Sequence, residues 1–231
     1  MRDITIAIDG HSSTGKSTIA KMVARALGYV YVDSGAMYRA VTLYAMEQGL
    51  IGYSAFHKDE LIEDLDNIKI DFEFNELSGQ TEIRLNGKNV EGAIRSMEVS
   101  NFVSPVATVP EVRRRLVRIQ HKLGENKGIV MDGRDIGTVV FPNAELKIYM
   151  TASAEVRAKR RFDELKDKGH RVVFEEVLRN VIERDHIDST RADSPLTKAE
   201  DAIEFDNTDI SIEEQYTKVM RLVRMTIEDE E

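Results

Sequence analysis

Short apolar runs alternate with longer amphipathic stretches along most of this chain. An apolar run at residues 4–8 predicts a buried strand, and helical spacing of apolar residues from Lys16 to Leu27, stopped by Gly28, predicts a helix. Further strands are predicted at residues 29–32, 129–131, 146–150 and 202–205. Further helices are predicted at about residues 36–48, 110–123, 154–168, 174–186 and 211–227. This order indicates an α/β fold with a parallel sheet and helices on both faces.

Residues 68–91 depart from that alternation. From Ile68 to Phe74, apolar and charged residues alternate, which is the period of a half-buried strand. A turn is predicted at 77–79 and a second strand at 81–85, followed by Asn86-Gly87, a strong hairpin signal. These residues predict a small antiparallel sheet inserted into the α/β domain.

The composition narrows the class of protein. The chain has 231 residues, 42% of them hydrophobic and none of them cysteine, which allows a sizeable core and excludes disulfides and thiolate metal sites. Its net charge of −9 argues against a general nucleic-acid partner. No apolar run approaches the ~20 residues of a membrane span, and the first residues lack a signal-peptide pattern. We therefore expect a cytoplasmic enzyme, monomeric by default, with no membrane partner.

A glycine-rich segment directly follows the first predicted strand and precedes the first predicted helix. It matches the pattern G-x-x-x-x-G-K-[ST], in which backbone N–H groups surround a phosphate and the helix N-terminus adds positive charge. The lysine would reach the β- and γ-phosphates, and the first hydroxyl after it would ligate Mg²⁺. The predicted ATP-binding residues are Gly10, His11, Ser12, Ser13, Thr14, Gly15, Lys16, Ser17 and Thr18.

This motif predicts binding of a nucleoside triphosphate, which leaves kinases, regulatory GTPases and ATP-driven motors as candidates. A guanine-reading N-K-x-D segment is missing, because Asn126-Lys127-Gly128 is followed by Ile129. A motor would usually carry more chain for mechanical coupling. The remaining question is which group receives the phosphate.

The segment Gly128–Phe141 is a candidate acceptor site. Its apolar run stops at Asp132-Gly133-Arg134-Asp135, at the carboxyl end of a predicted strand. These residues are either a turn closed by its own ion pairs or a place that holds a charged ligand. Ligands of open α/β sheets bind at the carboxyl ends of strands.

Other arginines have the same two interpretations. Ser34 and Arg39 are either a helix cap with a surface arginine or part of an anion site. Arg184, Asp188 and Arg191 share one helix face if the helix extends that far, as a salt-bridge ladder or as a binding face.

A third cluster of arginines stands at the start of a predicted helix. Arg157, Arg160 and Arg161 oppose the helix macrodipole there, so a purely structural role explains them poorly. An anionic ligand would remove the conflict.

Five segments together resemble the bacterial cytidylate kinases, the (d)CMP kinases of the nucleoside monophosphate kinase family. They are Gly10–Thr18, "DSGAMYR", "SPVATVPEVR", "DGRDIGTVVFP" and "ERDHIDSTR", and the resemblance runs from Ile4 to about Ile227. It implies a five-stranded parallel P-loop core at residues 1–34, 105–155 and 192–231. It also implies a CMP-binding domain at residues 35–104, with the antiparallel insertion at about 68–91, and a short lid at about 156–191.

The resemblance also implies roles for individual residues. It places Ser34, Arg39, Arg134 and Arg191 around the acceptor phosphate. It places Arg184 and Asp188 at the sugar, and Ser104, Arg113 and Asp135 at the cytosine. Its implied catalytic residues are Lys16, Arg134, Arg191 and the lid arginines Arg157 and Arg161. His11 stands where the family often has proline, and we expect its side chain to point outward. Ile187 and Ser189 also depart from the family pattern, which leaves the contacts of the lid open.

The chemistry implied is transfer of the ATP γ-phosphoryl group to CMP or dCMP. A phosphomonoester is mostly dianionic at neutral pH, so the acceptor needs no general base. Mg²⁺, Lys16 and the arginines would neutralise charge during in-line transfer. Ser17 is predicted to ligate Mg²⁺, and Asp132 to organise its shell through water or to orient Arg134. A kinase for UMP or another small acceptor, or a P-loop regulatory ATPase, remains an alternative.

Overall fold

A computed structural model describes residues 3–75 and 80–229 of the chain. It contains two compact units, one of Met1–Val32 with Gly124–Glu231 and one of Asp33–Leu123. The predicted turn at residues 77–79 lies outside the described residues. The finer division into core, CMP-binding domain and lid stays a prediction.

The first unit contains a five-stranded sheet in the order β2-β6-β1-β7-β8. Its strands are β1 (Thr5–Gly10), β2 (Val30–Asp33), β6 (Ile129–Gly133), β7 (Leu146–Thr151) and β8 (Ile203–Asp206). The central strand β1 pairs in parallel with both β6 and β7, and β7 pairs in parallel with β8. The parallel α/β fold predicted from the sequence is confirmed.

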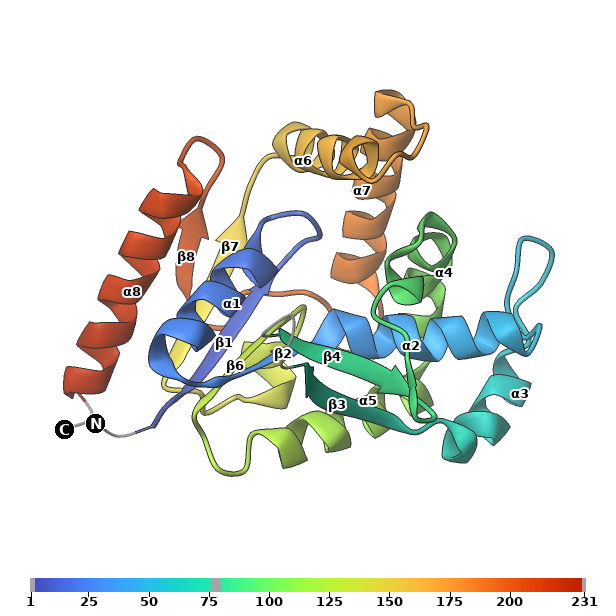
Figure 1. Cartoon of the computed structure of the whole chain (residues 1–231), viewed down its shortest axis with the longest axis horizontal. Coiled ribbons are helices and arrows are strands. Elements are labelled where there is room, and N and C mark those ends of the chain that lie inside the picture. Colours follow the sequence, from blue (N-terminus) through green and yellow to red (C-terminus); the bar gives the residue numbers. More distant parts are fainter. Residues whose placement is uncertain (1–2, 76–79, 230–231) are drawn as a thin grey trace. The chain divides into compact units, whose positions relative to one another are not determined.

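One face of this sheet is covered by α1 (Lys16–Leu27) and α8 (Ile212–Asp229), which lie beside the strands in Figure 1. Alternate residues of the first apolar run point to this face because side chains of a strand alternate between faces. The shared core includes Ile4, Ile6 and Ile8 with Ile19 and Val23 of α1 and Val219 and Val223 of α8. Each such side chain contributes roughly 1.5–3 kcal/mol when fully buried. The short helical segment η3 (Ile136–Val140) contacts β1 as well.

The helix ends follow their sequence signals. Gly28 ends α1 in the left-handed conformation, at φ 71°. At the start of α8, the Ser211 N–H donates to the Glu214 carboxylate at 3.0 Å and the Glu214 N–H donates to Ser211 Oγ at 3.2 Å. This reciprocal pair is a capping box.

Two further helices of the first unit are α6 (Ala154–Asp167) and α7 (Phe174–Thr190). Helix α7 extends beyond the predicted His186, so Arg184 and Asp188 lie on one helix and Arg191 caps it. No helix of the described residues is long and apolar enough to cross a membrane.

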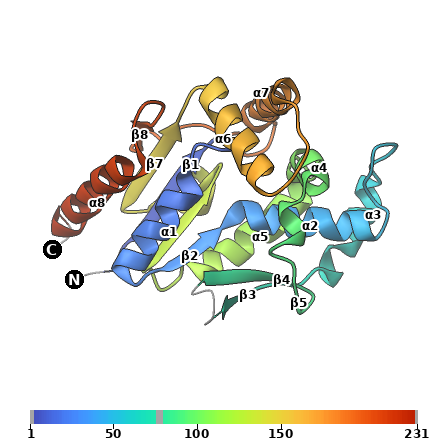
Figure 2. The same cartoon turned by 45° about the horizontal axis from the view of Figure 1, so that its top comes forward.

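The second unit is mainly helical. Its elements are α2 (Ser34–Glu47), α3 (Lys58–Glu63), η1 (Asp64–Asn67), β3 (Ile70–Asn75), β4 (Gln80–Leu85), β5 (Lys88–Asn89), η2 (Ala93–Arg95), α4 (Met97–Ala107) and α5 (Pro110–Leu123). Strands β3, β4 and β5 form the predicted antiparallel sheet, visible in Figure 2. Asn86 and Gly87 both have positive φ and join β4 to β5, as the hairpin signal predicts. Helix α4 was not predicted, and it contains Pro105 two residues before its last residue, Ala107.

Candidate active site

The glycine-rich loop connects β1 to α1, as predicted. Gly10 ends β1, and a Cβ atom there would stand 2.2 Å from the Met150 carbonyl oxygen, so no side chain fits. Gly15 precedes α1 with φ +88°, a conformation that glycine adopts without strain. The glycines of the motif are therefore needed for the close approach of β7 and for the turn into the helix.

Protein side chains hold several carbonyl oxygens of this loop. Thr14 Oγ1 and Lys16 Nζ both donate to the His11 carbonyl, at 3.1 and 3.0 Å. Arg157 Nη1 donates to the Ser12 carbonyl at 3.4 Å. Carbonyl oxygens repel an anion, whereas N–H groups attract one. In these contacts, the loop carbonyl oxygens that would repel an anion accept hydrogen bonds from protein donors.

Asn207, directly after β8, is a further support of the loop. Its side chain is fully buried, and Nδ2 donates to the Thr14 carbonyl at 2.6 Å and to Gln215 Oε1 at 2.8 Å. Arg160 donates to Asn207 Oδ1 at 3.0 Å and to its backbone carbonyl at 2.8 Å. Asn207 is not among the residues predicted from the sequence, where its position after a predicted strand is its only signal.

Ser17, the predicted Mg²⁺ ligand, is in direct contact with Asp132, which is predicted to organise the Mg²⁺ shell through water or to orient Arg134. Ser17 Oγ donates to Asp132 Oδ2 at 2.8 Å, and the Tyr31 hydroxyl donates to Oδ1 at 2.7 Å. The described residues contain no group of three or more His, Cys, Asp or Glu that could hold a metal alone. A hydroxyl beside one carboxylate nevertheless fits Mg²⁺, which is commonly bound through one or two carboxylates together with substrate phosphates.

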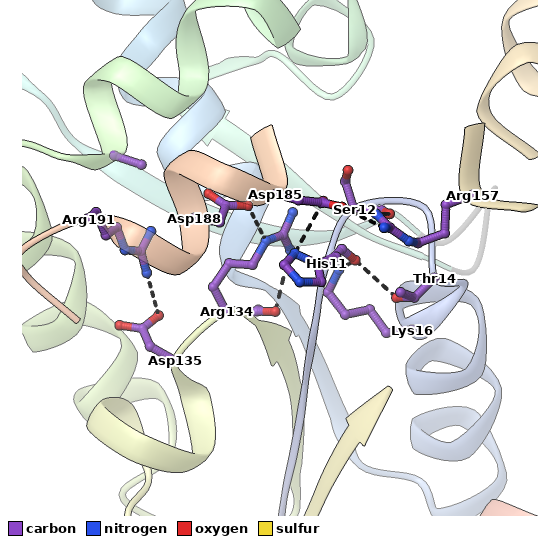
Figure 3. Close-up of polar contacts among 12 residues, drawn as sticks. His11, Ser12, Thr14, Lys16, Arg134, Asp135, Arg157, Asp185, Asp188 and Arg191 are labelled. Carbon is purple, nitrogen blue, oxygen red and sulfur yellow. Dashed lines mark hydrogen bonds and ion pairs between the residues drawn. The ribbon is translucent and has the colours of Figure 1, made fainter. Parts of the chain in front are cut away.

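Two residues that directly follow β6, Arg134 and Asp135, contact Asp188 of helix α7 and its C-terminal cap Arg191. Arg134 Nε donates to Asp188 Oδ2 at 2.7 Å, and Arg191 Nη2 lies 3.9 Å from Asp135 Oδ1 (Figure 3). Burial alone would raise the pKa of Asp188, but the guanidiniums of Arg134 and Arg184 lower it below its ordinary value. The structure thus brings together the predicted residues of two distant segments.

Arg184 adds positive charge that the protein only partly compensates. Desolvation, together with repulsion from Arg134, lowers the pKa of Arg184 to about 10. Its Nε is buried without a hydrogen-bond partner among the described residues. Buried donors normally find an acceptor. An anionic ligand at this point would supply one and would relieve the repulsion between the arginines.

Asp9, the last residue before Gly10, braces the turn that follows Asp135. Its carboxylate accepts from the N–H of Ile136 at 2.8 Å and from that of Gly137 at 2.7 Å. Burial raises the pKa of Asp9 from 3.8 to about 6, against the lowering effect of these two hydrogen bonds. Asp9 was not among the predicted site residues.

Two expectations about the arginine cluster and the loop are wrong. The His11 side chain does not extend into solvent; it is 21% exposed, and Nδ1 lies 3.2 Å from Asp185 Oδ1. Arg157 needs no ligand to balance its charge at the start of α6, because Asp185 accepts from it at 2.9 and 2.5 Å. Asp185 was not among the predicted site residues. Arg161 donates to Glu164 on its own helix at 2.9 Å.

In the second unit, Arg39 is not a plain surface arginine. Its Nη1 donates to Ser100 Oγ at 2.9 Å and to the Ile94 carbonyl at 3.3 Å. Ser34 is buried but does not cap α2; Asp33 does, by accepting from the Ala36 N–H at 2.9 Å. The carboxylate of Asp33 replaces the expected serine hydroxyl because the helix begins earlier than predicted.

Arg113 and Ser104 of the second unit are both buried. Arg113 Nη1 donates to the Ala107 carbonyl at 3.2 Å, and its guanidinium lies 5.4 Å from the centre of the Tyr38 ring. A buried arginine stacked on an aromatic ring has a fixed orientation. Their roles at the cytosine stay predictions.

The parallel sheet, the complete phosphate loop after its central strand and the arginine cluster define a P-loop kinase. A family model described as "Cytidylate kinase" matches residues 6–225. The cytidylate kinase of Flavobacterium johnsoniae is 62% identical over 223 residues, covering 96% of this chain and 97% of that protein. The cytidylate kinase of Bacteroides fragilis is 56% identical, covering 93% and 94%. The chain belongs to the cytidylate kinase family.

One solved structure is similar to this chain in fold but has little sequence identity with it. The gluconokinase from Sinorhizobium meliloti 1021 is similar to this chain with a TM-score of 0.50 and 13% identity. The match covers 98% of this chain and 95% of that one.

Proposed function

We propose that this protein is an ATP:(d)CMP phosphotransferase, which transfers the γ-phosphoryl group of ATP to the 5′-phosphate of CMP or dCMP and forms CDP or dCDP. One observation carries the proposal: the family match at residues 6–225 spans both the phosphate loop and the arginine cluster. A regulatory ATPase or a kinase for UMP is not favoured, because relatives at 55–62% identity over nearly the whole chain are described as cytidylate kinases.

For the donor, we assign residues 10–18 to the ATP phosphates. Lys16 would exchange its hydrogen bond to the His11 carbonyl for the β- and γ-phosphates. Ser17 and Asp132 would hold Mg²⁺, which neutralises charge on the phosphates when bound. Their mutual contact supports this assignment, since a hydroxyl oxygen and a carboxylate oxygen 2.8 Å apart are close enough to share one cation. Arg161 is assigned to the lid near the ATP phosphates.

For the acceptor, we assign residues separately to its phosphate, its sugar and its base. The phosphate is assigned to Ser34, Arg39, Arg134 and Arg191, the sugar to Arg184 and Asp188, and the base to Ser104, Arg113 and Asp135. The repulsion among the arginines of the first unit supports an anion there. Guanidinium groups bind phosphate through two parallel hydrogen bonds and so position it as well as neutralise it.

The cytosine ring offers a donor, N4–H₂, beside the acceptors N3 and O2. Asp135 would accept from N4, and Arg113 and Ser104 would donate to N3 and O2. Uracil presents a carbonyl in place of the amino group, which would face the Asp135 carboxylate. Such a contact discriminates by about 1–3 kcal/mol.

A coupled assay of ADP formation tests the proposal. Purified protein is given ATP and Mg²⁺ with CMP, dCMP, UMP, AMP, GMP or shikimate as acceptor. We expect rapid ADP formation with CMP and dCMP, slower formation with UMP, and loss of activity when EDTA removes the metal. ADP formation that is indifferent to CMP and dCMP would refute the proposal. We also propose a monomer, which light scattering tests, and a cytoplasmic location.

A further inference from the structure

We propose that Asp185 is a positioning residue that holds the first half of the phosphate loop through Arg157 and His11, and thereby sets the affinity for ATP. This inference rests on the proposed function, in which residues 10–18 bind the ATP phosphates. Asp185 lies on α7 and contacts residues of the loop and of α6 at once, as Figure 3 shows.

Arg157 is the centre of this arrangement. Its side chain is 5% exposed, and all three guanidinium nitrogens donate: Nε to the Ala152 carbonyl at 2.9 Å, Nη1 to Asp185 and to the Ser12 carbonyl, and Nη2 to Asp185. The bidentate pair with Asp185 fixes the plane of the guanidinium. That plane determines where Nη1 meets the Ser12 carbonyl, so Asp185 acts on the loop through Arg157.

His11 provides a second, independent connection. It belongs to the loop itself, and its Nδ1 lies 3.2 Å from the Asp185 oxygen that also accepts from Arg157. Adjacent loop residues, His11 and Ser12, are therefore both attached to the Asp185–Arg157 pair, one by its side chain and one by its carbonyl. A loop held at two neighbouring residues loses less conformational entropy when phosphate binds.

This role differs from the lid role that the family resemblance implies for Arg157. A lid arginine would leave its resting contacts and bind the ATP phosphates directly. Removing Asp185 would then free Arg157 for the phosphates and would leave ATP binding unchanged or tighter. If Asp185 instead positions the loop, its removal leaves Arg157 buried without its partner and weakens ATP binding. The two roles therefore predict opposite effects of removing Asp185 on the affinity for ATP.

The experiment compares Asp185→Asn with the matched control Asp163→Asn. Asp163 also accepts from a basic residue, Lys159, but it is half exposed and lies on the outer surface of α6. ATP affinity is measured by isothermal titration calorimetry with Mg-ATP and no acceptor, and the KM values for ATP and CMP by the coupled assay. We expect Asp185→Asn to weaken ATP binding about tenfold, as for a lost charge-assisted contact, and to leave the KM for CMP within about twofold. Asp163→Asn should change neither.

A double-mutant cycle of Asp185→Asn with Arg157→Ala tests whether Asp185 acts on ATP binding through Arg157. The double variant should bind ATP more weakly than Arg157→Ala by no more than the roughly threefold effect expected for His11, since both substitutions remove the Arg157–Asp185 pair and only Asp185→Asn also removes the contact with His11. Unchanged or tighter ATP binding by Asp185→Asn, an equal rise in both KM values, or additive effects in the cycle would overturn the inference.

Should Asp185→Asn unfold, His11→Ala provides the same test with a milder change. It removes one contact of the pair, and we expect about threefold weaker ATP binding with an unaltered KM for CMP. Unaltered ATP binding by a folded His11→Ala would then overturn the inference. Wild-type protein that binds ATP but forms no CDP would instead refute the proposed function, and the calorimetric comparison would stand.

Discussion

Arg134 and Asp188 are joined by an ion pair of 2.7 Å between Nε and Oδ2, although they lie 54 residues apart in the chain. Both side chains are largely buried. The pair connects the end of β6 to the last turns of α7, so the orientation of one assigned acceptor-phosphate ligand depends on a carboxylate assigned to the sugar.

Substitution of this carboxylate should act on the acceptor and not on the donor. In Asp188→Asn, Arg134 loses its charged partner and Arg184 loses a nearby negative charge. We expect a rise of about tenfold in the KM for CMP with the KM for ATP unchanged. Steady-state kinetics with each substrate varied measures both. Glu183→Gln, exposed on the same helix, is the control, and equal changes in the two KM values would contradict the assignment.

Asp135 should determine the preference of the enzyme for CMP over UMP. Asp135→Asn replaces one carboxylate oxygen by a donor, which could pair with the uracil O4. The ratio of kcat/KM for CMP to that for UMP is expected to fall about tenfold. Competition between the two acceptors in one reaction measures this ratio directly. A ratio that stays at the wild-type value in an active variant would show that Asp135 does not read the base.

The raised pKa of Asp9 has a consequence for stability. A carboxyl whose pKa is higher in the folded state, here about 6 against 3.8, binds more protons when folded, so its contribution to stability falls as the pH rises between these values. Asp9→Asn removes this titration. We expect the free energy of unfolding of wild type, relative to Asp9→Asn, to fall by about 1 kcal/mol between pH 5 and pH 7.5.

Urea unfolding of both proteins at the two pH values measures this difference. A difference for Asp9→Asn that is constant, or that grows with pH, would contradict the shift.

Gly10 and Gly28 allow a test of why the loop begins with glycine. Gly10→Ala places Cβ 2.2 Å from the Met150 carbonyl oxygen and also strains the backbone at φ +153°, whereas Gly28→Ala meets no heavy atom within 4 Å and strains only the backbone, at φ +71°. We expect losses of about 3 kcal/mol for Gly10→Ala and about 1 kcal/mol for Gly28→Ala. Urea unfolding compares them, and similar losses would show that backbone conformation, not the approach of β7, requires Gly10.

Several parts of this protein follow from the sequence because their signals are local. The phosphate loop, the hairpin at Asn86-Gly87 and the capping box of α8 each depend on residues a few positions apart, and backbone conformation and hydrogen bonding at that range dictate the outcome. The parallel sheet follows from the alternation of strands and helices. The family itself can be identified from short segments.

The partners of charged side chains, by contrast, were decided only by the tertiary structure. Nothing near Arg157 in the chain predicts Asp185, and nothing near Asp9 predicts that its carboxylate receives the N–H groups of Ile136 and Gly137. The sequence assigned the arginines at the start of α6 to a ligand, because the helix dipole disfavours cations there. For Arg157, folding supplied an acid, Asp185, from another helix. Ion pairing depends on distance in space, and a sequence states only distance along the chain.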